Sequence, residues 1–110
     1  MSDTIKVLGQ SEPAAATLTT LYTVPVGASA VISSLVVCNI TTGPQTFRAA
    51  VRPAGEAIAN KHYLYYDVSV PGNDTFVATL GITLATTDVF SIYSTNDDAL
   101  AFNLFGTEVS

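Results

Sequence analysis

Charged side chains are scarce in this chain of 110 residues. Only 12% of the residues are Asp, Glu, Lys or Arg, about half the usual fraction for a soluble protein. Threonine and serine supply much of the polar content, which suits exposed strand faces and turns. The net charge is −5, and the four basic residues are scattered along the chain. Such a chain is poorly suited to neutralising phosphates, so we expect no nucleic-acid partner.

Cysteine and histidine occur once each. Cys38 lies in the most apolar segment, where we interpret it as a buried, unreactive thiol, and no internal disulfide is possible. His62 has no Gly-x-Ser-x-Gly motif, Cys/His pair or His-x-x-x-His spacing around it, so we interpret it as a structural or surface residue. Asn73-Asp74 and Asn96-Asp97-Asp98 lack the EF-hand pattern and are typical of turns. We therefore predict no catalytic residue, no metal site and no cofactor, and we expect that the protein is not an enzyme.

Long hydrophobic runs and targeting signals are also missing. No charged residue occurs between Glu12 and Arg48, but Pro25, Gly27 and repeated Ser and Thr interrupt this stretch. A membrane helix needs about 20 apolar residues, so we expect no membrane partner. The N-terminus has no basic region followed by an apolar core, which argues against a secretory signal and favours synthesis in a cytoplasm.

Short alternating segments separated by turn residues account for most of the chain. Its length suits one domain over residues 1–110, with a short N-terminal strand or arm at about 1–16. One helical turn is plausible at 56–60. The alternation predicts about eight strands, at 5–8, 18–24, 28–40, 45–52, 62–70, 75–80 with a short piece at 82–84, 88–95 and 99–105. Their near-regular spacing predicts an all-β fold, a single antiparallel β-sandwich or a jelly-roll-like domain.

The segment 28–40 is predicted to be a central strand, because neither of its faces is purely polar. The turn at 41–44 favours an antiparallel hairpin with 45–52. If Ile40 pairs with Gln45, Cys38 lies opposite Phe47 on the core face. The opposite face then carries an apolar strip edged by two arginines, which we call the arginine-edged strip: Val31, Leu35, Val37, Arg48 and Arg52. Apolar groups combined with arginine favour an oligomer or docking interface.

Three tyrosines, Tyr63, Tyr65 and Tyr66, follow the single histidine in the predicted strand 62–70. Aromatic rings with polar tips suit stacking against carbohydrate. Alternating aromatic residues in a sandwich strand more often pack in the core or at an edge. Glycan contact is therefore the weaker of the two interpretations.

Eight short motifs, mostly turns and core strands, are spread over nearly the whole chain. They are Lys6-Val-Leu-Gly-Gln10, Leu21-Tyr-Thr-Val-Pro25, Val36-Val-Cys-Asn39, Thr46-Phe-Arg48 with Val51, His62-Tyr-Leu-Tyr-Tyr-Asp67, Gly72-Asn-Asp-Thr75, Gly81-Ile-Thr-Leu84 and Phe105-Gly-Thr-Glu108. Together they resemble a group of small proteins encoded in tailed-bacteriophage genomes. The resemblance implies a structural protein of the virion, and no catalytic residue comes with it.

The leading hypothesis is a non-enzymatic structural component of a tailed-phage virion, made in the host cytoplasm. We expect a homotrimeric β-sandwich of the tail fibre, baseplate or capsid surface, whose partners are its own copies and other virion proteins. A capsid decoration (cement) protein is one alternative. A carbohydrate-binding module that contacts host-surface glycans is another, and an enzyme comes last.

Overall fold

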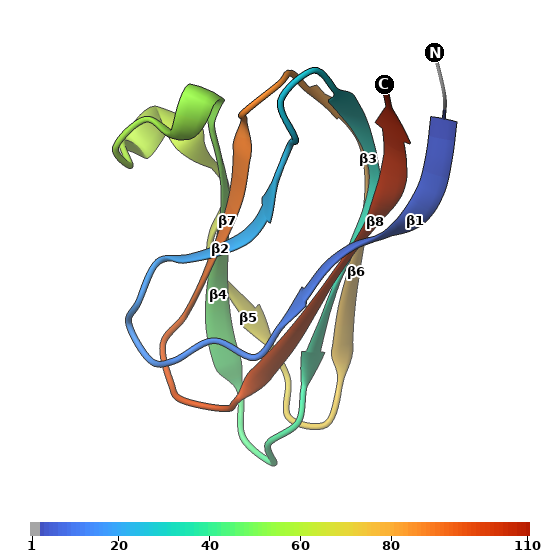
Figure 1. The fold of residues 1–110 in the computed structure, drawn as a ribbon. Coiled ribbons are helices and arrows are strands. Elements are labelled where there is room, and N and C mark those ends of the chain that lie inside the picture. Colours follow the sequence, from blue (N-terminus) through green and yellow to red (C-terminus); the bar gives the residue numbers. More distant parts are fainter. Residues whose placement is uncertain (1–2) are drawn as a thin grey trace.

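Two four-stranded antiparallel sheets packed face to face form the fold (Figure 1), in a computed structural model that describes residues 3–110. Sheet A has the strand order β1-β8-β3-β6, and sheet B has the order β2-β7-β4-β5. The predicted all-β sandwich of eight strands is confirmed. The strands are β1 (Asp3–Ser11), β2 (Thr19–Thr23), β3 (Ser29–Asn39), β4 (Gln45–Arg52), β5 (Tyr63–Val70), β6 (Thr75–Leu84), β7 (Val89–Ser94) and β8 (Leu100–Val109), and two 3-10 turns, η1 (Pro53–Gly55) and η2 (Asn60–His62), separate β4 from β5.

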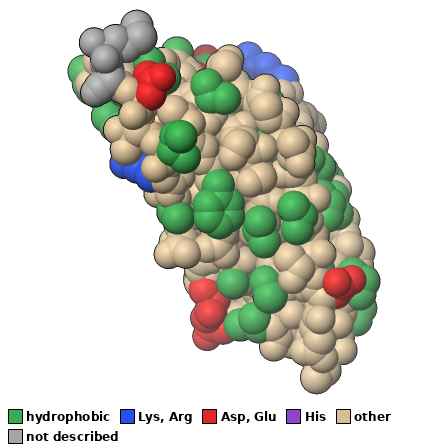
Figure 2. Space-filling view, turned by 90° about the vertical axis from the view of Figure 1, so that its right-hand side faces the viewer, with side chains coloured by type: hydrophobic (Ala, Val, Ile, Leu, Met, Phe, Trp, Pro, Cys, Tyr) green, Lys and Arg blue, Asp and Glu red, His purple; other side chains and the backbone are tan. Residues whose placement is uncertain are grey.

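The strand pairing follows that of one long hairpin rolled up on itself. The first strand pairs with the last, β2 with β7, β3 with β6 and β4 with β5, and rolling adds the pairs β3–β8 and β4–β7. An eight-stranded double sheet of this kind is a jelly roll. Only the connection between β4 and β5 joins neighbours in one sheet, and the other connections cross between the sheets. The molecule measures 45 × 27 × 19 Å and is elongated in outline (Figure 2).

The helical turn that we predicted at 56–60 is not where the structure places one. The 3-10 turns lie instead at 53–55, before that segment, and at 60–62, where η2 begins at the last residue of the predicted turn. Pro53 occupies the start of η1, where its fixed φ and missing N–H favour a turn. The whole connection 53–62 lies over the outer side of sheet B (Figure 1).

The predicted hairpin between β3 and β4 is wrong, because the two strands lie in different sheets. The segment 40–44 is an arch that crosses the sandwich. The buried Asn39 side chain fixes it: Nδ2 donates to the carbonyls of Gly43 and Val70, both at 2.9 Å, and Oδ1 accepts the N–H of Thr41 at 2.9 Å. Backbone groups that leave a sheet need other partners, and this amide supplies them.

A bulge in β3 reverses which side chains face the core. The register against both neighbouring strands shifts between Ile32 and Ser34. Ala30 and Ile32 are buried before the shift, and Leu35 and Val37 are buried after it. Because strand side chains alternate with a period of two, one extra residue exchanges the two faces of the strand.

The arginine-edged strip therefore does not exist as one surface. Leu35 and Val37 belong to the core, with 0% of each residue exposed. Val31 lies on the outer side of sheet A and is 41% exposed. Arg48 and Arg52 belong to β4, on the outer side of sheet B. The predicted interface residues are thus divided among three environments.

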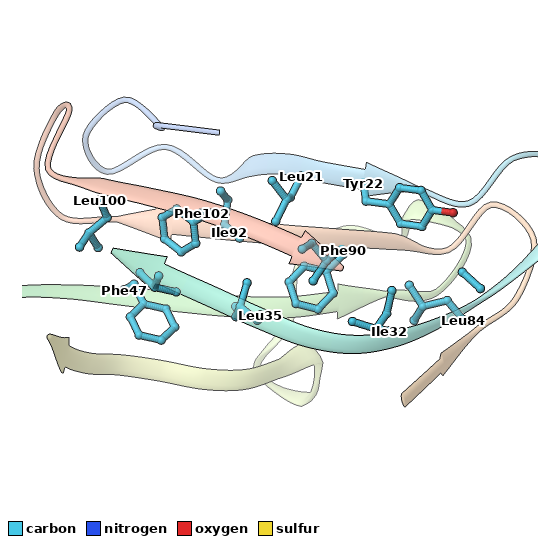
Figure 3. Packing of buried hydrophobic residues seen from close by; sticks show 14 of the residues in the cluster. Leu21, Tyr22, Ile32, Leu35, Phe47, Leu84, Phe90, Ile92, Leu100 and Phe102 are labelled. Carbon is cyan, nitrogen blue, oxygen red and sulfur yellow. The ribbon is translucent and has the colours of Figure 1, made fainter. Parts of the chain in front are cut away.

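Aromatic rings from both sheets fill one end of the core (Figure 3). The ring of Phe47, from sheet B, lies 5.2 Å from that of Phe76 and 5.9 Å from that of Phe102, both in sheet A. Phe47 thus fills the space between the sheets, as predicted. Cys38 does not face it: the β3 bulge places this thiol, half-buried, on the outer side of sheet A.

Two glycines of sheet A allow the backbone to approach a neighbouring strand closely, Gly9 across the sandwich and Gly106 within its own sheet. A Cβ atom on Gly9 would lie 2.2 Å from the carbonyl oxygen of Leu21 in the opposite sheet. A Cβ atom on Gly106 would lie at the same distance from the carbonyl oxygen of Val31. Both contacts involve main-chain atoms, which cannot rotate away as a side chain can.

Candidate functional site

The outer face of sheet A carries an unusual share of the exposed apolar side chains. Ile5, Val7, Val31 and Val77 are respectively 86%, 47%, 41% and 62% exposed. Strand pairing brings Ile5 and Val31 together, because both lie opposite Thr107. Val77 lies further along the sheet, opposite Val36, whereas Val31 is opposite Thr83. A face that gathers exposed apolar side chains and carries little charge is a candidate interaction site in a soluble protein. Alternation places these residues on the face: Ile5, Val7, Gln10, Val31, Ser34, Val36, Cys38, Val77, Thr79, Thr83, Asn103, Phe105 and Thr107.

This face is nearly free of charge over the part of the chain that the structure describes. β3 and β6 contain no charged residue, and the charged residues of β1 and β8 are Asp3, Lys6 and Glu108. Asp3 pairs with Val109 at the end of the sheet. Figure 2 shows hydrophobic side chains spread over the face, separated by other side chains and backbone, with charged ones mostly near its margin.

The carboxylate of Glu108 is directed away from this face, toward sheet B. Its Oε2 accepts the hydroxyl of Tyr22 from β2 at 2.6 Å, and its Oε1 lies 3.0 Å from the Lys6 ammonium. The Tyr22 hydroxyl, and then Lys6, lower the pKa of Glu108 from its ordinary value. Burial, together with this carboxylate, raises the pKa of Tyr22. The Lys6 ammonium and the Glu108 carboxylate thus pair with each other at the border of the apolar face.

An arginine held between two tyrosine rings dominates the outer face of sheet B. The Arg48 guanidinium carbon lies 4.1 Å from the ring centre of Tyr66 and 4.4 Å from that of Tyr93. Its Nε donates to Asp67 Oδ1 at 2.7 Å, and a terminal nitrogen donates to Oδ2 at 3.3 Å. This two-point pair with Asp67 raises the pKa of Arg48. We call Arg48, Asp67, Tyr66 and Tyr93 the arginine clamp. We expected the Arg48 charge to lie at an interface, but the clamp pairs it within a single molecule.

The second arginine of the predicted strip also has intramolecular partners. Arg52 Nε donates to the hydroxyl of the buried Ser91 at 3.1 Å. A terminal nitrogen donates to the carbonyl of Glu56 at 3.0 Å. Arg52 therefore holds the 53–62 connection against sheet B.

Two of the three tyrosines proposed for glycan contact lie together. Tyr63 and Tyr66 have ring centres 4.9 Å apart, at 83° to each other, and with Asn60 they line a hollow of about 380 Å³. Tyr65 points into the sandwich, with ring centres 6.0 Å from Phe47 and 5.3 Å from Phe76. Register shifts of β5 against β4 on both sides of Ala49 cause this separation. Asn60 was not expected here, because only the folding of the connection brings it near β5.

His62 is buried and structural. Its Nδ1 accepts the N–H of Ala59 at 3.0 Å, so Nε2 carries the ring proton and donates to Glu56 Oε1 at 3.1 Å. A ring bonded at both nitrogens is fixed in one orientation. This histidine orders η2 and thereby positions Asn60.

Residues 3–110 contain no group of three or more His, Cys, Asp or Glu side chains placed to hold a metal ion. None of their helices has the length and apolar content needed to cross a bilayer. A second hollow, of about 430 Å³, lies where the β2–β3 and β6–β7 turns meet the C-terminus. It is lined by small, hydroxyl-bearing or apolar residues: Gly27, Ala28, Ser29, Ala85, Thr86, Val109 and Ser110.

Comparison of the chain with protein-family models, with curated proteins and with solved structures finds no match.

Proposed function

We propose that this protein is a non-enzymatic structural module of a tailed-phage virion that assembles through the outer face of sheet A. The observation that carries the proposal is this nearly uncharged face with its four exposed large apolar side chains. Interface centres are depleted in Lys, Glu and Asp, as this face is. The phage context comes from the resemblance of the sequence motifs.

The size of the face suits assembly by repeated contacts. Strands of nine to eleven residues, four abreast, present a surface on the order of 600 Å² at the usual spacings in a sheet. A standard interface buries roughly 800 Å² on each partner. One such contact therefore buries less area than a standard interface, and we expect its affinity to be low by itself. In an oligomer or a particle, several contacts act together and raise the overall affinity.

The expected oligomer is a trimer, placed on a tail fibre, a baseplate or the capsid surface, and a capsid decoration (cement) protein is the alternative. Jelly rolls occur in viral capsid domains and also in lectins. Since a fold by itself does not specify a function, the proposal depends on the face and the motifs. The copy number per particle, from gel densitometry of purified virions, distinguishes a decoration protein from a tail component.

The decisive experiment places a carboxylate on the face. Val77→Glu and Val31→Glu should each shift the protein toward monomer in analytical ultracentrifugation, with an unchanged circular dichroism spectrum. A carboxylate in an apolar contact must lose its water, at a cost of several kcal/mol. Ile58→Glu is the matched control: Ile58 is also an exposed apolar residue, 39% exposed, but it lies in the 53–62 connection on the other sheet, so this variant should assemble normally.

Raising the salt concentration gives an independent check. An uncharged contact should persist in high salt, whereas a contact built on ion pairs should weaken. A wild-type protein that is monomeric at micromolar concentration, or glutamate variants that assemble normally, would refute the proposal.

A further inference from the structure

We propose that the hollow lined by Asn60, Tyr63 and Tyr66 is a binding site for a neutral carbohydrate. The hollow belongs to the outer side of sheet B, opposite the face proposed for assembly. The inference does not depend on the proposed function, because it uses different residues on a different sheet.

The Tyr66 ring is both exposed and fixed. It is 55% exposed, yet the Arg48 guanidinium lies against it at 4.1 Å and Tyr63 meets it nearly at a right angle. Arg48 is in turn held by Asp67 and Tyr93 in the arginine clamp. A ring that is already immobile loses little conformational entropy when a ligand binds. An exposed aromatic ring of this kind suits the apolar C–H face of a pyranose.

The polar groups of the hollow complement sugar hydroxyls. A tyrosine hydroxyl can both donate and accept a hydrogen bond, and the side-chain amide of Asn60 offers a donor and an acceptor. Sugar hydroxyls have the same dual character. The lining residues carry no formal charge at neutral pH, and the nearby Arg48 is paired with Asp67. This balance favours a neutral sugar over an acidic one.

The third wall of the hollow is rigid as well. Asn60 begins η2, and the buried His62 at the end of this turn bonds the Ala59 N–H with one ring nitrogen and Glu56 with the other. A volume of about 380 Å³ falls within the usual range for small-ligand pockets. With three lining residues, the hollow fits one or two sugar rings at the end of a glycan better than an extended peptide.

The test uses assembled wild-type protein and neutral sugars: glucose, galactose, N-acetylglucosamine, lactose and maltose, followed by a glycan array. Saturation-transfer NMR should detect at least one of these sugars. Tyr66→Ala and Tyr63→Ala should each weaken binding by about tenfold or more, since a lost ring contact is worth roughly a decade in affinity. Tyr65→Phe is the matched control; its ring packs inside the sandwich, so binding should be unchanged.

A second variant covers the case in which Tyr66→Ala perturbs the fold. Tyr66→Phe keeps the ring against Arg48 and should retain stacking while losing the contribution of the hydroxyl. The Val77→Glu variant should still bind sugar, whatever its oligomeric state. Three outcomes would each overturn the inference. The wild-type protein binds none of the sugars and nothing on the array, sugar binding survives both alanine substitutions, or the protein selectively binds a proline-rich peptide.

Discussion

Removing the Phe47 ring tests how firmly the two sheets are packed together. Phe47 has 0% of its surface exposed, and the neighbouring rings of Tyr65, Phe76 and Phe102 come from three strands in both sheets. Replacing a buried phenylalanine by alanine costs about 3–5 kcal/mol, depending on how far the site collapses. Here collapse would require the two sheets, each stiffened by its own ladders of hydrogen bonds, to move toward each other. We therefore expect Phe47→Ala to lower the free energy of unfolding by about 4 kcal/mol.

This loss is large against the roughly 5–15 kcal/mol that stabilises a typical domain. Since 1 kcal/mol corresponds to about 4–8 °C in a domain of similar size, Tm should fall by on the order of 20 °C. Thermal unfolding followed by circular dichroism measures this fall in Tm. The protein concentration must be the same for both proteins, because assembly also raises Tm. Phe47→Leu keeps most of the buried volume and should cost about 1–2 kcal/mol. A Tm for Phe47→Ala within a few degrees of wild type would refute this account of the core.

Further substitutions test other parts of the structure. Leu35→Glu should prevent folding, because Leu35 is in the core, whereas Val31→Glu on the outer face should keep its circular dichroism spectrum; equal behaviour of the two would contradict the bulge. Gly106→Ala should cost about 3 kcal/mol or more in denaturant unfolding, since its Cβ would lie 2.2 Å from the Val31 carbonyl oxygen. Because the Tyr22 hydroxyl lowers the folded-state pKa of Glu108, this carboxylate should stabilise the fold above its ordinary pKa of 4.5, and that stability should be lost as the pH falls through the lower, folded value. Glu108→Gln should flatten this part of the profile of Tm against pH, and an unchanged profile would count against the contact.

The sequence by itself determined the strands and the class of fold. The segment 45–52 was predicted with the bounds that β4 has in the structure, and 28–40 contains β3 with one residue to spare at each end. Alternation and turn residues are local signals, and they lie within each segment. Burial of Phe47 could also be predicted, because an aromatic residue on the apolar face of a strand has few alternatives to the core.

Tertiary structure alone decided which sheet each strand joins. The residues at 41–44 suit a hairpin or an arch equally well by their local pattern. The arch is fixed by the Asn39 amide, which bonds the carbonyl of Val70, a residue 31 positions away in the chain. Since such a contact forms only when distant strands meet, no local pattern indicated it. The predicted pairing of β3 with β4 failed for this reason.

Tertiary structure also decided which side chains share a surface. β3 is apolar on both faces, so its sequence tolerates either orientation, and the bulge after Ile32 selected the one that buries Leu35 and exposes Val31. Register shifts in β5 likewise turned Tyr65 inward and left Tyr63 beside Tyr66. In both strands a shift of one residue exchanged the faces, because side chains alternate with a period of two while the pairing register is set by neighbouring strands.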